Sequence, residues 1–108
     1  MASSYRVLGQ SNPGATTLTS LYTVPAATSA VCSTLSVCNL STAASFRVAV
    51  RPAGASIANQ HYIVYDSVLS ANDTVFLTLG ISLAATDVVS VYSSTANLVF
   101  NLFGSEIA

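Results

Sequence analysis

The residues of this chain that could do acid–base chemistry are few, and their spacing does not assemble a catalytic group. His61 is the one histidine, and Asp66 follows it five positions later in what we expect to be a single strand. Because successive side chains of a strand alternate between its faces, this separation puts the two on opposite sides. The chain also lacks a Gly-x-Ser-x-Gly nucleophile turn. We therefore predict no catalytic residues and no enzymatic activity.

The other aspartates are typical of turns rather than of a metal or cofactor site. Asp73 follows Asn72, and Asp87 follows Thr86, in short polar stretches where aspartate accepts hydrogen bonds from nearby main-chain amides. Turn carboxylates can also bind calcium, but two isolated aspartates form no ligand cluster. The glycines are too dispersed for a phosphate-binding loop. The sequence thus predicts no metal and no cofactor.

The two cysteines, Cys32 and Cys38, lie six positions apart in one expected strand. At about 3.3 Å per residue they are about 20 Å apart, beyond the about 7 Å between Cα atoms that a disulfide allows. We expect two free thiols with packing roles, in a chain made in a reducing cytoplasm.

Two arginines are candidates for contacts between subunits. Arg47 and Arg51 project from the same face of one expected strand, about 13 Å apart. A buried arginine needs a carboxylate partner, and Asp66 or Glu106, from the same or a neighbouring copy, could serve. We predict that such pairs, with Arg47, Arg51 and Asp66 foremost, set the register between subunits.

Tyr62 and Tyr65 are candidates for contact with a ligand or partner. Aromatic rings stack on the apolar faces of sugars, which makes a carbohydrate one such ligand. Tyrosine is also an ordinary strand and interface residue, so a purely structural role stays open.

These residues belong to a chain that carries almost no charge. Charged residues are 6% of its 108 residues, against about 25% in an ordinary soluble domain. Three arginines and a net charge of −1 offer no basic patch for nucleic acid. No apolar run reaches the about 18 residues of a membrane span, and no signal-peptide pattern is present. Since a monomer normally stays soluble through a charged surface, we expect much of this surface to be buried in an assembly.

The elements that position these side chains are predicted to be strands throughout. Apolar and polar residues alternate with a period of two, and Asn, Asp, Gly and Pro mark the turns. The expected strands are Tyr5–Gln10, Thr16–Val24, Ala30–Asn39, Ser45–Arg51, His61–Ser67, Thr74–Leu79, Val88–Ser93 and Leu98–Phe103. This pattern predicts one antiparallel all-β sandwich over residues 1–108, jelly-roll-like, with residues 1–15 as a candidate extended N-terminal arm.

Strict alternation also predicts which side chains share a face. In the third strand, Val31, Leu35 and Val37 are expected on one face. In the fifth, Tyr65 and Asp66 are expected on opposite faces. The fifth and eighth strands carry apolar or aromatic residues on both faces, which indicates either a partner surface or β-bulges that shift the alternation.

Several segments together resemble a known class of protein. They are Leu21–Ala26, Ala30–Asn39, Phe46–Pro52, Ala71–Thr74 and Thr86–Ser94. This pattern, from about Leu21 to Ile107, is similar to small virion structural proteins of tailed bacteriophages, cyanophages among them. The resemblance implies assembly in many copies in a virion and assigns no catalytic residue. It leaves capsid decoration, neck, baseplate and fibre open.

We therefore expect a structural subunit of a tailed-phage virion, made in the host cytoplasm and acting by oligomeric packing. Its expected partners are itself, as a trimer because fibre and capsid-cement modules commonly use that symmetry, and capsid or tail proteins. The alternative is a carbohydrate- or receptor-binding sandwich at a fibre tip, which would contact a host surface glycan through Tyr62 and Tyr65. We expect no nucleic acid partner and no membrane span.

Overall fold

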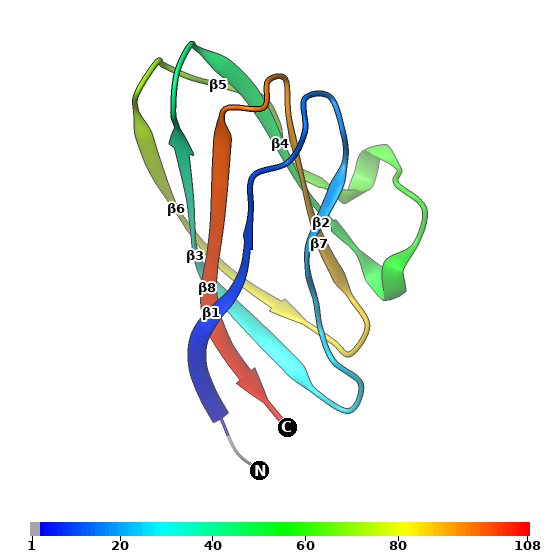
Figure 1. Cartoon of the computed structure of the whole chain (residues 1–108). Helices are drawn as coiled ribbons and strands as arrows, with labels where there is room; N and C mark the ends of the chain where they lie inside the picture. Colours follow the sequence, from blue (N-terminus) through cyan, green and yellow to red (C-terminus); the bar gives the residue numbers. More distant parts are fainter. Residues whose placement is uncertain (1–2) are drawn as a thin grey trace.

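The structure, a computed structural model, describes residues 3–108 as a chain of β-strands (Figure 1). The strands are β1 (Ser3–Ser11), β2 (Thr19–Thr23), β3 (Ser29–Asn39), β4 (Ala44–Arg51), β5 (Tyr62–Leu69), β6 (Thr74–Leu83), β7 (Val88–Ser93) and β8 (Leu98–Ile107). Two short 3-10 turns, η1 (Pro52–Gly54) and η2 (Asn59–His61), lie in the connection between β4 and β5. All the expected strands are present, with β2 shorter and β1, β6 and β8 longer than expected.

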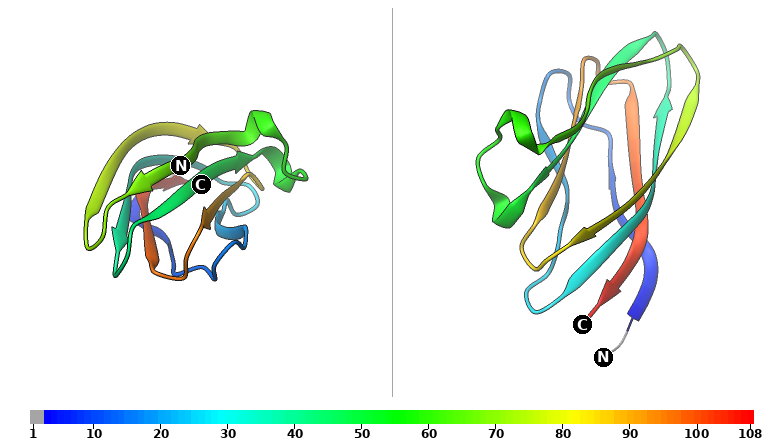
Figure 2. Two further views of the ribbon diagram at one scale, coloured as in Figure 1. Left: turned by 90° about the horizontal axis from the view of Figure 1, so that it is seen from above. Right: turned by 180° about the vertical axis from the view of Figure 1, so that it is seen from behind.

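The strands form two four-stranded sheets in the orders β1-β8-β3-β6 and β2-β7-β4-β5. The pairs β1·β8, β2·β7, β3·β6 and β4·β5 are all antiparallel, so the chain is arranged as one long hairpin folded over on itself. This is the strand order of a jelly roll. Figure 2 shows the two layers from above and from behind, with the β4–β5 connection projecting to one side. The predicted all-β sandwich is confirmed.

The N-terminal segment belongs to the first sheet. β1 pairs with β8 along its length, which gives its main-chain groups hydrogen-bond partners. Residues 3–11 are therefore a sheet strand and not the extended arm predicted over residues 1–15. Met1 and Ala2 lie outside the described residues.

The core lies between the two sheets. Phe46 of β4 meets Phe100 of β8 edge to face, with ring centroids 6.1 Å apart, so this contact joins the layers. Around them are fully buried aliphatic side chains from both sheets, among them Leu35, Val37, Val48, Val89, Val91, Leu98 and Leu102. Burial of each such side chain contributes about 1.5–3 kcal/mol, which makes this layer the main source of stability.

A β-bulge in β3 changes which residues enter the core. The register of β3 shifts after Cys32 against both of its neighbours, β6 and β8. Cys32 is fully buried and Val31 is 37% exposed, whereas Leu35 and Val37 point inward beyond the shift. The prediction that Val31 shares a face with Leu35 and Val37 is wrong, because the extra residue, Ser33, moves the alternation by one position.

Candidate functional site

All three arginines of the chain are bound by groups of the chain itself. Arg6 pairs with Glu106 at 3.1 Å, and Arg47 pairs with Asp66 at 2.6 Å. Arg51 donates to the hydroxyl oxygen of Ser90 at 3.1 Å, and it also bonds main-chain oxygens of the β4–β5 connection. These arginines join neighbouring strands and loops of one copy.

Asp73 and Asp87 bind main-chain amides at turns, as the sequence predicts. The carboxylate of Asp73 accepts a hydrogen bond from the N–H of Thr74 at 2.8 Å. Asp87 accepts one from Ala53 and one from Ala84, each at 2.9 Å, and so ties the β4–β5 connection to the β6–β7 turn. In residues 3–108, no three His, Cys, Asp or Glu side chains gather as a metal ion would require.

A second bulge places Tyr65 and Asp66 on one side of the β2-β7-β4-β5 sheet. The register of β4 and β5 shifts between Phe46 and Val48, so that Arg47 faces two residues of β5. Asp66 has φ +51, in the left-handed region. Bulges re-aim side chains in this way. The prediction that Tyr65 and Asp66 lie on opposite faces is therefore wrong.

The guanidinium group of Arg47 is held by three side chains. Its Nε donates to Asp66 Oδ1 at 2.6 Å and its Nη2 to Oδ2 at 3.3 Å. Its central carbon lies 4.3 Å from the ring centroids of both Tyr65 and Tyr92, a cation–π arrangement. The hydrogen bond to Asp66 raises the pKa of Arg47, which keeps the group charged. The pair lies within one chain, and a role of Arg47, Arg51 and Asp66 between subunits stays a prediction.

A hollow of about 450 Å³ lies beside this cluster and is lined by Asn59, Tyr62 and Tyr65. The rings of Tyr62 and Tyr65 meet edge to face, with centroids 4.9 Å apart. The fold thus brings together the two tyrosines that the sequence indicated as contact residues. His61 is near them in the chain, but its Nδ1 accepts a hydrogen bond from the N–H of Ala58.

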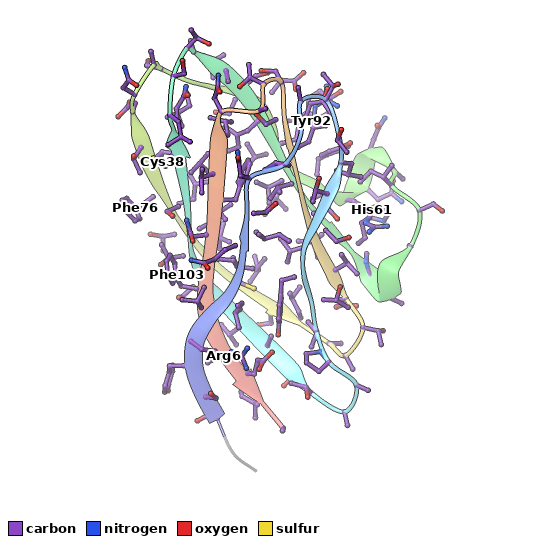
Figure 3. The ribbon with its side chains drawn as sticks, in the orientation of Figure 1. Arg6, Cys38, His61, Phe76, Tyr92 and Phe103 are labelled. Carbon is purple, nitrogen blue, oxygen red and sulfur yellow. The ribbon has the colours of Figure 1, made fainter. Side chains whose placement is uncertain are left out.

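The opposite side of the molecule presents a sheet face of a different kind. Alternation along the paired strands of β1-β8-β3-β6 gives four cross-strand rows on the outer face. They are Tyr5, Ser105, Val31 and Ser82; Val7, Phe103, Thr34 and Thr78; Gln10, Asn101, Ser36 and Phe76; and Val99, Cys38 and Thr74. We call this set the uncharged face, because none of its members carries a charge. Figure 3 shows Phe76 and Phe103 on this side and His61 and Tyr92 on the other.

The charged side chains of β1 and β8 project from the inward side of the sheet, although Arg6 at its margin stays 56% exposed. Arg6 and Glu106 occupy the alternate positions between Tyr5, Val7 and Ser105. Glu106 accepts a hydrogen bond from the hydroxyl group of Tyr22 at 2.6 Å, which comes from the facing sheet. The outer surface is left with apolar and small polar side chains, of which Tyr5 is 85% exposed and Phe76 68% exposed.

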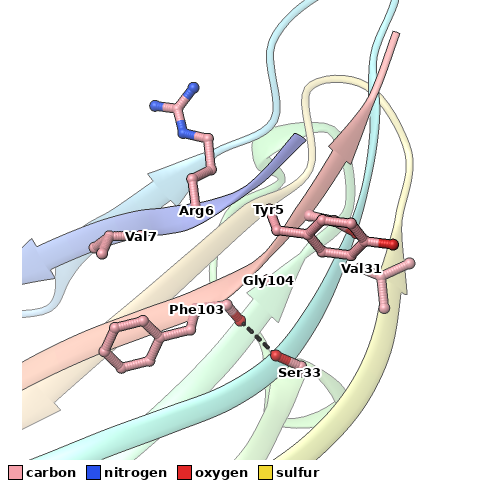
Figure 4. A pocket seen from close by; sticks show the side chains of 8 residues that line it. Tyr5, Arg6, Val7, Val31, Ser33, Phe103 and Gly104 are labelled. Carbon is pink, nitrogen blue, oxygen red and sulfur yellow. Dashed lines mark hydrogen bonds between the residues drawn. The ribbon is translucent and has the colours of Figure 1, made fainter. Parts of the chain in front are cut away.

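A hollow of about 570 Å³ lies on the uncharged face over β1, β8 and β3 (Figure 4). Its lining residues are Tyr5, Arg6, Val7, Val31, Ser33, Phe103, Gly104 and Ser105. The hydroxyl group of Ser33 donates to the main-chain oxygen of Phe103 at 3.2 Å. Figure 4 shows the guanidinium group of Arg6 directed away from the other side chains drawn. The hollow is therefore a largely apolar depression.

Comparison of the chain with protein-family models and with curated proteins finds no match. In the part of the chain that the structure describes, no helix is long and apolar enough to cross a membrane. Sequence reasoning did not identify Asn59, which stands in no pattern that signals a contact, and it did not single out Tyr92 from the other tyrosines as a partner of Arg47. The functional argument therefore depends on two surfaces, the uncharged face and the hollow beside Tyr62 and Tyr65.

Proposed function

We propose that this chain is a structural subunit of a tailed-phage virion, and that it associates with copies of itself through the uncharged face. The virion assignment rests on the sequence resemblance. The self-association rests on one observation: a face four strands wide has no charged side chain, while Tyr5 and Phe76 stand exposed on it. A sheet face in permanent contact with water normally carries charged and polar side chains.

The location of the charges supports this proposal. Each arginine and each carboxylate of the chain binds another group of the same chain, so these charges serve the fold. A second copy matches such a face well, because burial of the face leaves no charge unpaired. A standard interface buries about 800 Å² per partner, roughly a seventh of the 5341 Å² surface of this chain. A trimer remains the expected state, and capsid or tail proteins would bind the surfaces that stay free.

The mass of the purified chain in solution, measured by light scattering over a range of concentrations, tests self-association. We expect a multiple of the 11.1 kDa chain mass. Tyr5→Lys introduces a charge into the uncharged face and should raise the dissociation constant at least tenfold. Val68→Lys is the matched control, because Val68 is 73% exposed on β5 of the other sheet. A chain that is monomeric at every concentration contradicts the proposal, as does a Tyr5→Lys variant with unchanged mass.

The virion assignment has its own test. Peptides of this chain should be found by mass spectrometry in purified particles of a phage whose genome encodes it, at many copies per particle. Absence from such particles, with the chain present in the infected cell, would contradict a structural role in the virion.

The hollow at Tyr62 and Tyr65 favours a second function, contact with a host surface glycan. Tyr65 is 58% exposed, and Asn59 lines the same hollow, so an aromatic ring for stacking and an amide side chain for hydrogen bonds to hydroxyl groups stand together. A glycan array should then give a specific signal that Tyr62→Ala and Tyr65→Ala abolish, with Tyr5→Ala as the control. No signal, or a signal that persists in both variants, argues against this function.

A further inference from the structure

We infer that β6 is a self-pairing edge: the β6 strands of two copies align antiparallel about a two-fold axis at Phe76 and join two β1-β8-β3-β6 sheets into one. This inference rests on the proposed self-association and adds a second contact, at the sheet edge, to the contact through the uncharged face. The uncharged faces of the two copies then lie side by side, so the pairing doubles the continuous uncharged surface.

β6 is a sheet edge with an unprotected segment, Thr74–Thr78; beyond it Leu79 and Gly80 lie opposite the single residue Ser33 at a register shift, and Gly80 has φ +62. Among the described strands β6 pairs with β3 alone, and it runs for 10 residues, Thr74–Leu83, without a charged residue or a proline. A long edge of this kind offers unpaired N–H and C=O groups to another strand. Proteins usually protect such edges by short length, charge, proline or bulges.

The other three edges are shorter or carry charge. β2 has 5 residues and a register shift after Ser20. β5 has two register shifts, and its charged residue Asp66 has a backbone in the left-handed region. β1 carries Arg6 and a shift after Val7. Of the four edge strands, β6 alone is long and uncharged and contains a segment, Thr74–Thr78, in which the register does not shift.

The main-chain groups of this segment alternate between β3 and the free edge. The N–H of Asn39 donates to the main-chain oxygen of Asp73 at 2.8 Å, at the start of the β3–β6 ladder. In an antiparallel ladder every second residue bonds the partner strand. Thr74, Phe76 and Thr78 therefore direct their N–H and C=O groups to the free edge. Their side chains are exposed on the uncharged face.

The order of residue types in this segment matches a two-fold axis. The sequence Thr74-Val75-Phe76-Leu77-Thr78 is a palindrome by residue class. An axis at Phe76 aligns threonine with threonine, valine with leucine and phenylalanine with phenylalanine. Threonine pairs and aromatic pairs are favourable across strands, and the three edge-facing positions would form about six main-chain hydrogen bonds. A second copy is therefore the partner strand that this edge fits, in the self-complementary manner of two-fold interfaces.

Thr78→Pro tests the pairing through the main chain. The N–H of Thr78 faces the free edge, so proline removes a donor to the second copy and leaves the bonds to β3 in place. We expect the dissociation constant of the assembly to rise at least tenfold. Thr78→Val, which keeps the N–H and loses only the side-chain contact of the threonine pair, is the matched control and should weaken the assembly much less than Thr78→Pro.

A cysteine at the axis gives a second test that does not depend on the folding of the proline variant. In a Cys38→Ser background, Phe76→Cys places two thiols directly opposite each other, with Cα atoms about 5.5 Å apart, within the range of a disulfide. Oxidation should produce a covalent dimer. Ser82→Cys, exposed on the same strand outside the palindrome, should not crosslink.

The outcomes separate this inference from the proposed function. If Tyr5→Lys dissociates the assembly while Thr78→Pro does not and Phe76→Cys fails to crosslink, the edge pairing is wrong and self-association stands. An assembly with an odd number of copies also overturns the pairing, because a two-fold axis joins copies in pairs; a trimer formed through the uncharged face is compatible with the pairing only as a hexamer of two trimers. A chain that is monomeric at every concentration overturns both.

Discussion

Asp66 reaches Arg47, with 2.6 Å between Oδ1 and Nε, because residue 66 adopts a left-handed backbone at φ +51. That conformation costs an ordinary residue about 1–2 kcal/mol. An exposed ion pair contributes about 0–1 kcal/mol, so the pair by itself does not offset the strain. Aspartate tolerates this region better than most residues, and the two-point hydrogen bonding and the two rings against Arg47 add to the stabilisation.

Substitutions of Asp66 separate the charge from the backbone. Asparagine tolerates the left-handed region and loses only the charge, so we expect Asp66→Asn to lower the free energy of unfolding by less than about 1 kcal/mol. Asp66→Ala loses the pair and adds strain, so we expect a loss of about 1–2 kcal/mol. Urea unfolding of both variants measures the difference. Equal losses would show that the left-handed backbone contributes nothing to the effect.

The two thiols should differ in reactivity. Cys32 is fully buried in the core, and burial raises its pKa to about 11, so little reactive thiolate is present at neutral pH. Cys38 lies partly exposed on the uncharged face. A thiol reagent should modify one cysteine of the dilute native chain quickly and both after unfolding. Cys38→Ser should remove the fast reaction, and two fast thiols in the native chain would contradict the burial of Cys32.

Stability should fall at alkaline pH. Burial, together with the hydrogen bond to Glu106, raises the pKa of Tyr22 above its usual value near 10, and burial raises that of Cys32 from 9.0 to about 11. Because the folded state holds both protons more tightly, their contribution is complete below about pH 9 and is lost as pH rises. The slope is about 1.4 kcal/mol per pH unit for each group.

Urea unfolding between pH 8 and pH 11 measures this dependence, and the absence of lysine removes its usual contribution in this range. Tyr22→Phe should flatten the profile above pH 10, and Cys32→Ala should flatten it between pH 9 and pH 11. Profiles of the two variants that match the native one would contradict the assignment.

Gly104 should tolerate no side chain. A Cβ atom at this position of β8 would lie 2.0 Å from the main-chain oxygen of Val31, and a main-chain atom between paired strands cannot move aside. We expect Gly104→Ala to cost about 2–3 kcal/mol or more. Gly14→Ala is the control, since its Cβ would lie 3.8 Å from the Thr17 hydroxyl oxygen. The control should be neutral or stabilising by up to about 1 kcal/mol in thermal unfolding, and similar losses in both variants would contradict the argument.

The strands could be predicted from the sequence, but the bulges could not. Period-two alternation is a local property, and it located every strand to within a few residues. Whether Ser33 forms a bulge depends on the strands beside it, β6 and β8, which a local pattern does not contain. The predicted face of Val31 was wrong for this reason, and so was that of Asp66.

The candidate contact residues were predicted in part. Tyr62 and Tyr65 were both singled out as contact residues, but strict alternation puts them on opposite faces of the strand, whereas in the structure their rings meet. The rarity of carboxylates left Asp66 and Glu106 as candidate partners of the arginines, whereas the choice of Asp66 for Arg47, and of the same copy over a neighbouring copy, needed the tertiary structure. Tyr92 comes from β7, and only the pairing of β4 with β7 brings it to Arg47.

By itself, the sequence determined that the chain is a β-sandwich with very few charges, because composition and alternation are properties of short segments. Only the tertiary structure decided where those charges stand. Arg6 meets Glu106 across 100 positions because the first strand pairs with the last. The same long-range pairing sets four neutral strand faces side by side and leaves β6 at an edge. Which distant strands become neighbours depends on how the whole chain folds, so no local sequence pattern could have revealed it.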